Sequence, residues 1–140
     1  MELNPNTEIQ PLIGSKEGIL HVTLAFVNPG EQVLVPNPGY PTYTSLSKIL
    51  GAEVINYDLK EEDGWMPDFE ALEKMDLSRV KLMWTNYPNM PTGANATPEL
   101  YERLVDFARR KNIVIVNDNP YSFILNEKPI SILSVPGAKE

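Results

Sequence analysis

Cysteine is absent from this 140-residue chain, so it holds neither disulfides nor thiolate zinc sites. Positive charge is scarce as well, because 12 Lys and Arg residues stand against 19 Asp and Glu residues. The resulting net charge of −7 argues against a nucleic-acid partner. No apolar run approaches the roughly 18 residues of a membrane span, and the first residues do not resemble a signal peptide. We therefore expect a soluble, cytoplasmic protein with no membrane partner and no metal site.

Short apolar segments alternate with helix signals along the chain. Strands are expected at residues 9–13, 32–35, 53–57, 80–85 and 113–117. Helix signals include Pro41 in a first turn, Asp68 as a cap, and Thr97 followed by Pro98. A further helix, expected to be buried, is predicted at residues 19–26. This alternation predicts an α/β fold with three α/β/α layers around a mainly parallel sheet.

The stretch from Lys81 to Tyr121 carries the strongest functional signal. An apolar strand opens into the loop Asn-Tyr-Pro-Asn-Met-Pro-Thr-Gly at 86–93, and a helix and a second apolar strand follow, ending at Asp118. Parallel sheets bind ligands at the carboxyl ends of their strands, so an acid there indicates a cofactor site. A nucleotide-binding Rossmann module shares the alternation, but the chain has no Gly-x-Gly-x-x-Gly turn.

Several motifs occur in a distinctive order: Gly-Ser-Lys-Glu-Gly at 14–18, Asn-Pro-Gly at 28–30, Pro-Gly-Tyr-Pro at 38–41, the loop at 86–93, and Asp118 to Tyr121. Together they resemble the large domain of class I and II aminotransferases. These are fold-type-I pyridoxal-phosphate (PLP) enzymes, and the resemblance is strongest to the branch of LL-diaminopimelate and aspartate aminotransferases. It implies that residues 1–140 are part of the PLP-binding large domain, with strands in the order 3-2-4-5 when segment 9–13 is counted first.

Members of that family are longer than this chain. The resemblance implies that the amino-terminal segment, the segment with the PLP lysine and the small domain lie outside it. No catalytic residue is then expected within residues 1–140, and the chain alone is expected to be inactive. The parent enzyme is expected to be a cytoplasmic homodimer that moves an amino group between an amino acid and a 2-oxo acid.

The resemblance also predicts which strand lies at the edge of the sheet. The strand that ends at Asp118 should be an unpaired apolar edge, which is a template for pairing with another chain. Association of separate copies is expected there or through bared apolar faces. Segment 9–13 is expected to be displaced, because its own neighbour in the sheet would be missing.

The turn before the first predicted helix is a candidate phosphate site. Its backbone N–H groups and the positive end of the helix dipole can hold an anion. The resemblance assigns the PLP phosphate to Ser15 and Lys16. A glycine-bounded turn without a ligand is the alternative interpretation.

The remaining candidates concern the PLP ring. Tyr40 lies in a rigid turn, where an aromatic side chain can stack on a flat ring or pack against its own loop. Asp118 would face the ring nitrogen and keep it protonated, which deepens the electron sink; a helix cap or turn role is the alternative. Tyr121 would donate a hydrogen bond to the phenolic oxygen of the ring. Tyr43, one helical turn after Tyr40, is expected to serve ordinary packing.

Met90 departs from the family pattern. The family has asparagine there, whose side chain bonds the phenolic oxygen, whereas methionine is a weak acceptor and no donor. Either Asn89 or Asn86 takes over this contact, or the contact is weakened, or the activity has diverged. Two other functions keep the same cofactor: a PLP-dependent carbon–sulfur β-lyase, and a non-catalytic PLP-binding regulatory domain.

Overall fold

The computed structural model describes residues 2–139. The strands are β1 (Gln32–Asn37), β2 (Glu53–Asp58), β3 (Val80–Asn86) and β4 (Val114–Asp118). They form one parallel sheet of four strands in the order β2-β1-β3-β4. The helices are α1 (Ser15–Phe26), α2 (Pro41–Ile49), α3 (Phe69–Lys74), α4 (Pro98–Lys111) and α5 (Ser122–Leu125), with short 3₁₀ turns η1 (Glu61–Asp63) and η2 (Ile132–Ser134). The predicted α/β class and the spatial order 3-2-4-5 are both confirmed.

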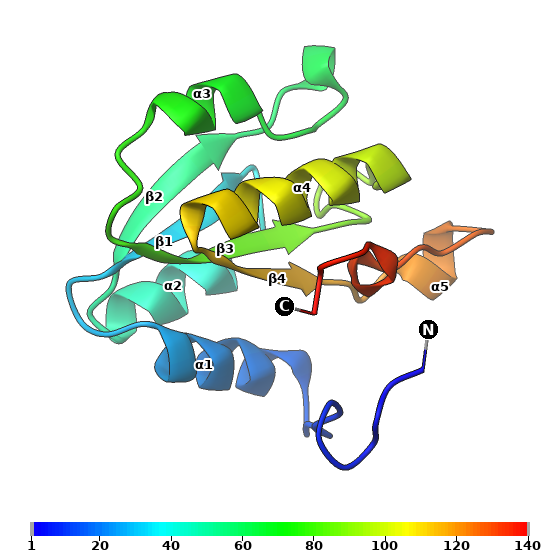
Figure 1. The fold of residues 1–140 in the computed structure, drawn as a ribbon, viewed down its shortest axis with the longest axis horizontal. Coiled ribbons are helices and arrows are strands. Elements are labelled where there is room, and N and C mark those ends of the chain that lie inside the picture. Colours follow the sequence, from blue (N-terminus) through cyan, green and yellow to red (C-terminus); the bar gives the residue numbers. More distant parts are fainter. Residues whose placement is uncertain (1, 140) are drawn as a thin grey trace.

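The sheet separates two apolar cores, which makes the molecule three layers thick. Helices α1 and α2 cover one face, and α3 and α4 cover the other (Figure 1). Successive strand residues point to opposite faces, so Val33 and Val35 join the core under α1 and α2, whereas Leu34 joins the core under α3 and α4. Burial on both faces explains why the two central strands, β1 and β3, are mostly apolar along their length.

Helix caps form where the sequence predicts them. The Asp68 carboxylate accepts a hydrogen bond from the Ala71 N–H at 3.0 Å at the start of α3. The Thr97 hydroxyl accepts one from the Leu100 N–H at 3.1 Å, and Pro98 occupies the first turn of α4. Capping is local in sequence, so these two boundaries are confirmed.

The amino-terminal region differs from the prediction. Residues 9–13 form no strand, and Ile13 is 99% exposed. A strand needs a neighbour for its backbone groups, and none is available to this segment among residues 2–139. Helix α1 begins at Ser15 rather than at residue 19, and it is only partly buried, because Leu24 is 57% exposed.

Strand β4 is an edge of the sheet, as predicted, since its only strand neighbour among the described residues is β3. Val114, which belongs to β4, and the neighbouring Phe26 and Leu133 are apolar side chains that are partly exposed. Association of copies through this edge remains a prediction.

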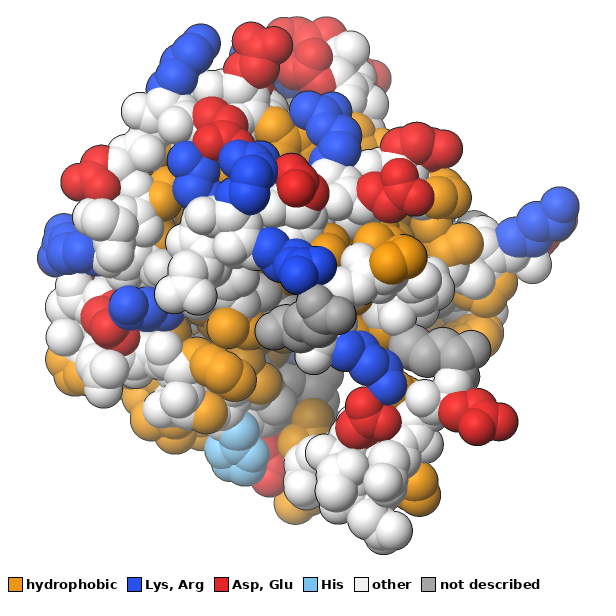
Figure 2. All heavy atoms as spheres, in the orientation of Figure 1, with side chains coloured by type: hydrophobic (Ala, Val, Ile, Leu, Met, Phe, Trp, Pro, Cys, Tyr) orange, Lys and Arg blue, Asp and Glu red, His pale blue; other side chains and the backbone are white. Residues whose placement is uncertain are grey.

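Charged side chains of both signs are interspersed on the side of the molecule that carries α3 and α4 (Figure 2). There Glu73 pairs with Arg110 at 2.6 Å and with Lys111 at 2.7 Å, which joins the two helices. No helix within residues 2–139 is long and apolar enough to cross a membrane.

Candidate active site

A cleft of about 150 Å³ lies at the carboxyl ends of β3 and β4. Its lining residues are Ser15, Tyr40, Tyr43, Asn86, Met90, Asp118, Pro120 and Tyr121. The topology explains this meeting: Asn86 and Asp118 are paired in the β3–β4 register and end their strands. In a parallel sheet, the helices that follow strands begin at this same edge.

Ser15 brings the start of α1 to the cleft. Gly14 at the N-cap is extended and supplies no side-chain cap, so the first turn of α1 leaves backbone N–H groups without a side-chain acceptor. Lys16 is exposed and does not line the cleft. The start of α1 is thus suited to an anion, through backbone groups and the helix dipole.

Tyr40 lies at the start of α2, just after a turn in which the backbone at Gly39 approaches the backbone of Pro36 closely. A Cβ atom at Gly39 would lie 2.5 Å from the carbonyl oxygen of Pro36, so only glycine fits this turn. Tyr40 is the N-cap residue, and Pro41 occupies the first turn of the helix. The Tyr40 ring meets the Tyr43 ring edge-on, with centroids 5.6 Å apart.

Asp118 is held by a residue that the sequence analysis assigned to ordinary packing. The Tyr43 hydroxyl donates a hydrogen bond of 2.7 Å to the Asp118 carboxylate. Burial, and then the adjacent Asp118 carboxylate, raise the pKa of Tyr43 far above its usual value, so the hydroxyl stays protonated. The Tyr43 ring also stacks on Trp84, with centroids 4.7 Å apart and planes 6° apart.

The expectation for Tyr43 is therefore wrong in part: its ring packs, but its hydroxyl holds the carboxylate. A usable signal was its spacing, because residues three apart in a helix lie on the same face. Tyr40 stands just before the helix and Tyr43 follows it by three positions. Both line the cleft.

Asn86 links the two sides of the cleft. Its carboxamide oxygen accepts a hydrogen bond from the Met90 N–H at 2.7 Å, and its nitrogen donates to the Asp118 carbonyl oxygen at 2.8 Å. Met90 lines the same cleft as Asp118. Sequence reasoning named Asn86 only as a possible substitute for the missing asparagine.

Asn89 lies elsewhere in the loop. It is buried and does not line the cleft, and its side-chain oxygen accepts a hydrogen bond from the Thr92 hydroxyl at 2.8 Å. Its side-chain nitrogen has no hydrogen-bond partner among the described residues. Asn89 therefore helps to shape the loop, and its side-chain NH2 group is free to donate.

The end of β4 is also held from its other side. The Thr85 hydroxyl donates to the Asn117 side-chain oxygen at 3.0 Å, and the Asn117 nitrogen donates to the Tyr101 hydroxyl at 3.3 Å. Asn117 and Asp118 are adjacent, so their side chains leave the strand on opposite faces. Helix α4 thus restrains Asn117 near the end of β4, and the next residue, Asp118, lines the cleft.

Comparisons with known proteins identify the family of this chain. The family model "Aminotransferase class I and II" matches residues 1–138. An LL-diaminopimelate aminotransferase from Aquifex aeolicus is 49% identical over 142 residues, covering 100% of this chain and 37% of that protein. One from Dehalococcoides mccartyi is 45% identical, with the same coverage of 100% and 37%.

Solved structures of similar chains share the fold. The apo structure of BacF from Bacillus subtilis has a TM-score of 0.91 and 40% identity, covering 99% of this chain and 37% of that one. A probable N-succinyldiaminopimelate aminotransferase from Thermus thermophilus also has a TM-score of 0.91, at 31% identity, covering 99% and 38%. This chain thus spans a little over a third of the length of these relatives. Because the family model covers nearly all of its residues, the chain belongs to the class I and II aminotransferase family.

Proposed function

We propose that the full-length protein is a PLP-dependent aminotransferase that moves an amino group between an amino acid and a 2-oxo acid. Membership of a PLP-dependent family supports this proposal. The observation that carries it is the common cleft shared by Ser15, Tyr40, Asp118 and Tyr121, the side chains expected around this cofactor.

The donor set of the cleft fits PLP. An uncapped helix start at Ser15 suits a phosphate, and Tyr40 offers an aromatic face for a planar ring. Asp118 suits a protonated ring nitrogen, because the Tyr43 hydroxyl fixes its carboxylate. Bound PLP supplies an electron sink for chemistry at the substrate α-carbon.

The chain's own residues then have distinct tasks. Asp118 would hold the proton on the ring nitrogen, and Tyr43 holds Asp118. Tyr121 would donate a hydrogen bond to the phenolic oxygen of the ring. We also propose, from the family resemblance, that Lys16 assists at the phosphate, and that Asn89 offers its spare donor near the ring; both residues lie outside the cleft lining.

We propose further that the full-length protein is a cytoplasmic homodimer and that residues 1–140 belong to its PLP-binding large domain. The names of its relatives make LL-diaminopimelate the first amino donor to test. The match to chains nearly three times as long supports a lysine-bearing segment and a small domain outside these residues.

A substrate screen with the full-length protein tests the proposal. The protein is incubated with PLP, one amino donor and one 2-oxo acid, and the products are identified by mass spectrometry. Formation of the amino acid that matches the added oxo acid is the expected result. Release of ammonia and a thiol from a cysteine-type substrate would instead identify a β-lyase. Bound PLP with no turnover of any donor would indicate a binding domain.

A further inference from the structure

The Asn86 side chain hydrogen-bonds both the loop that follows β3, at residues 87–93, and the end of β4. It is 2% exposed, and both ends of its carboxamide are used by backbone groups. Those groups, the Met90 N–H and the Asp118 carbonyl, lie where β3 and β4 end. A strand end leaves such groups without a ladder partner, and burying them unpaired is costly.

Other contacts of the loop are internal or go to another part of the molecule. The Asn89 N–H donates to the Ala94 carbonyl at 2.8 Å, and the Gly93 N–H donates to the Asn89 carbonyl at 2.7 Å. The Tyr87 hydroxyl donates to the Trp65 carbonyl at 2.8 Å, in the segment between η1 and α3. Among the described residues, the Asn86 side chain is the one that hydrogen-bonds both the Met90 N–H and the Asp118 carbonyl.

We infer that Asn86 is a positioning residue. It sets the distance between Met90, which lines the cleft, and the Asp118 carboxylate. The inference rests on the proposed function where it concerns PLP. Asparagine suits the task because it carries one acceptor and a donor group on a short side chain. Aspartate would keep the acceptor for the Met90 N–H, lose the donor, and bring a second carboxylate toward Asp118.

Two variants of the full-length protein separate the two links. Asn86→Ala removes both hydrogen bonds, and Asn86→Asp keeps only the one to Met90. We expect the Met90 amide to exchange with solvent at least about tenfold faster in Asn86→Ala and at the wild-type rate in Asn86→Asp. This measurement needs no cofactor. Unchanged exchange in Asn86→Ala would overturn the link to the loop.

The cofactor provides the second measurement. We expect both variants to bind PLP about tenfold more weakly than the wild type. In Asn86→Asp, the added carboxylate should also move the pH midpoint of the bound cofactor's absorbance upward, because negative charge favours protonated forms. Affinity and spectrum equal to the wild type in both folded variants would overturn the positioning role.

Asn37→Ala is the matched control. Asn37 ends β1 as Asn86 ends β3, and it donates a side-chain hydrogen bond to Asp58 at 2.8 Å, but it does not line the cleft. It should leave PLP affinity unchanged, and an equal loss there would overturn the claim for Asn86. A wild type that binds no PLP would overturn the proposed function, and the Met90 exchange would still decide whether Asn86 holds the loop.

Discussion

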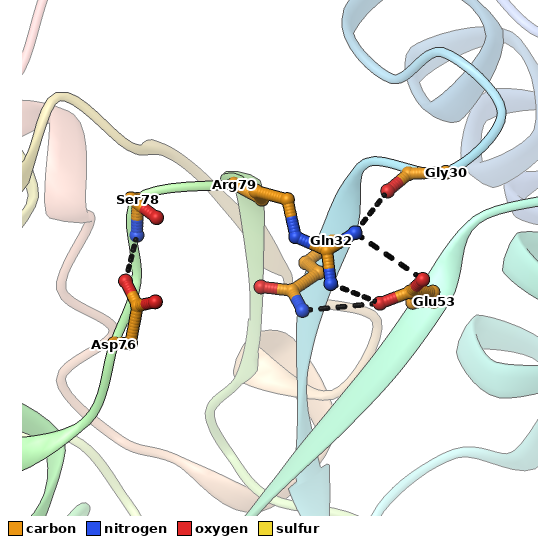
Figure 3. A network of polar contacts seen from close by, with 6 residues as sticks. All are labelled: Gly30, Gln32, Glu53, Asp76, Ser78 and Arg79. Carbon is orange, nitrogen blue, oxygen red and sulfur yellow. Dashed lines mark hydrogen bonds and ion pairs between the residues drawn. The ribbon is translucent and has the colours of Figure 1, made fainter.

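At the amino ends of the strands, polar side chains form an exposed, charged network (Figure 3), whereas at the carboxyl ends of β3 and β4 the side chains that hold Asp118 are buried. Arg79 pairs with Glu53 at 2.7 Å, and both side chains are more than half exposed. Gln32 donates to the same carboxylate at 3.1 Å. By contrast, Tyr43 and Asn86 are 0% and 2% exposed and hold Asp118 from two directions.

The difference teaches where polar groups affect function and where they chiefly aid solubility. Water competes for the exposed pair, so its net contribution to stability is small. Buried hydrogen bonds cannot be replaced by water, so removing one partner leaves the other unsatisfied. We therefore expect substitutions of the buried polar residues at the carboxyl ends of β3 and β4 to change chemistry, and substitutions at the amino ends of the strands to change little.

The largest effect is expected for Asp118→Asn in the full-length protein. Losing the charge opposite the ring nitrogen should slow the half-reaction with the amino acid about 10²–10³-fold, as for other preorganised electrostatic contacts. Tyr121→Phe removes one hydrogen bond of about 0.5–1.5 kcal/mol and should cost roughly tenfold or less. Stopped-flow absorbance of both variants gives the ordering. Equal losses would refute the special role of Asp118.

Tyr43→Phe should have an intermediate effect. The ring still stacks on Trp84, but the carboxylate of Asp118 loses its buried donor, and PLP affinity should fall about tenfold, or ~1.4 kcal/mol. Because the pKa of Tyr43 is raised above its usual value, its hydroxyl stays protonated from pH 6 to 9, and the deficit should be constant across that range. Fluorescence titration of PLP at several pH values measures it. A deficit that disappears by pH 9 would contradict this account.

Met90→Asn tests whether position 90 can supply the bound cofactor with a hydrogen-bond donor. The backbone N–H of Met90 is held by Asn86 and the residue lines the cleft, so an asparagine at this position should bring a donor to the cleft. That donor favours the deprotonated form of the bound cofactor and should lower the pH midpoint of its absorbance by roughly 0.5–1 unit. A spectroscopic pH titration measures this shift. An unchanged midpoint would mean that another residue, Asn89 foremost, already serves the ring.

Glu53→Gln, at the amino end, should have the smallest effect, with a change in Tm of about 2 °C or less at pH 7. Hydrogen bonds from Arg79 and then Gln32 lower the pKa of Glu53. A lowered folded-state pKa adds stability above the unfolded-state pKa, and this is lost as pH falls through the folded value. The difference from the wild type should thus vanish in acid. A loss of PLP affinity in this variant would break the contrast between the two ends.

Local chemistry determined much of this protein from the sequence. Strands at 32–35, 53–57, 80–85 and 113–117 follow from apolar runs, and the caps at Asp68 and Thr97 follow from contacts three residues apart. The ordered motifs also predicted the family and most residues that line the cleft. The binding roles of Ser15, Lys16, Tyr40, Asn89, Asp118 and Tyr121 remain predictions.

Only the tertiary structure decided the remaining features. Tyr43 and Asp118 are 75 residues apart in sequence, and Asn86 and Asp118 are 32 apart, so the register of β3 and β4 and the docking of α2 bring them together. Segment 9–13 has an apolar pattern suited to a strand, yet a strand exists only beside a partner that satisfies its backbone. Sequence patterns report what a segment can form, whereas long-range packing selects its partners.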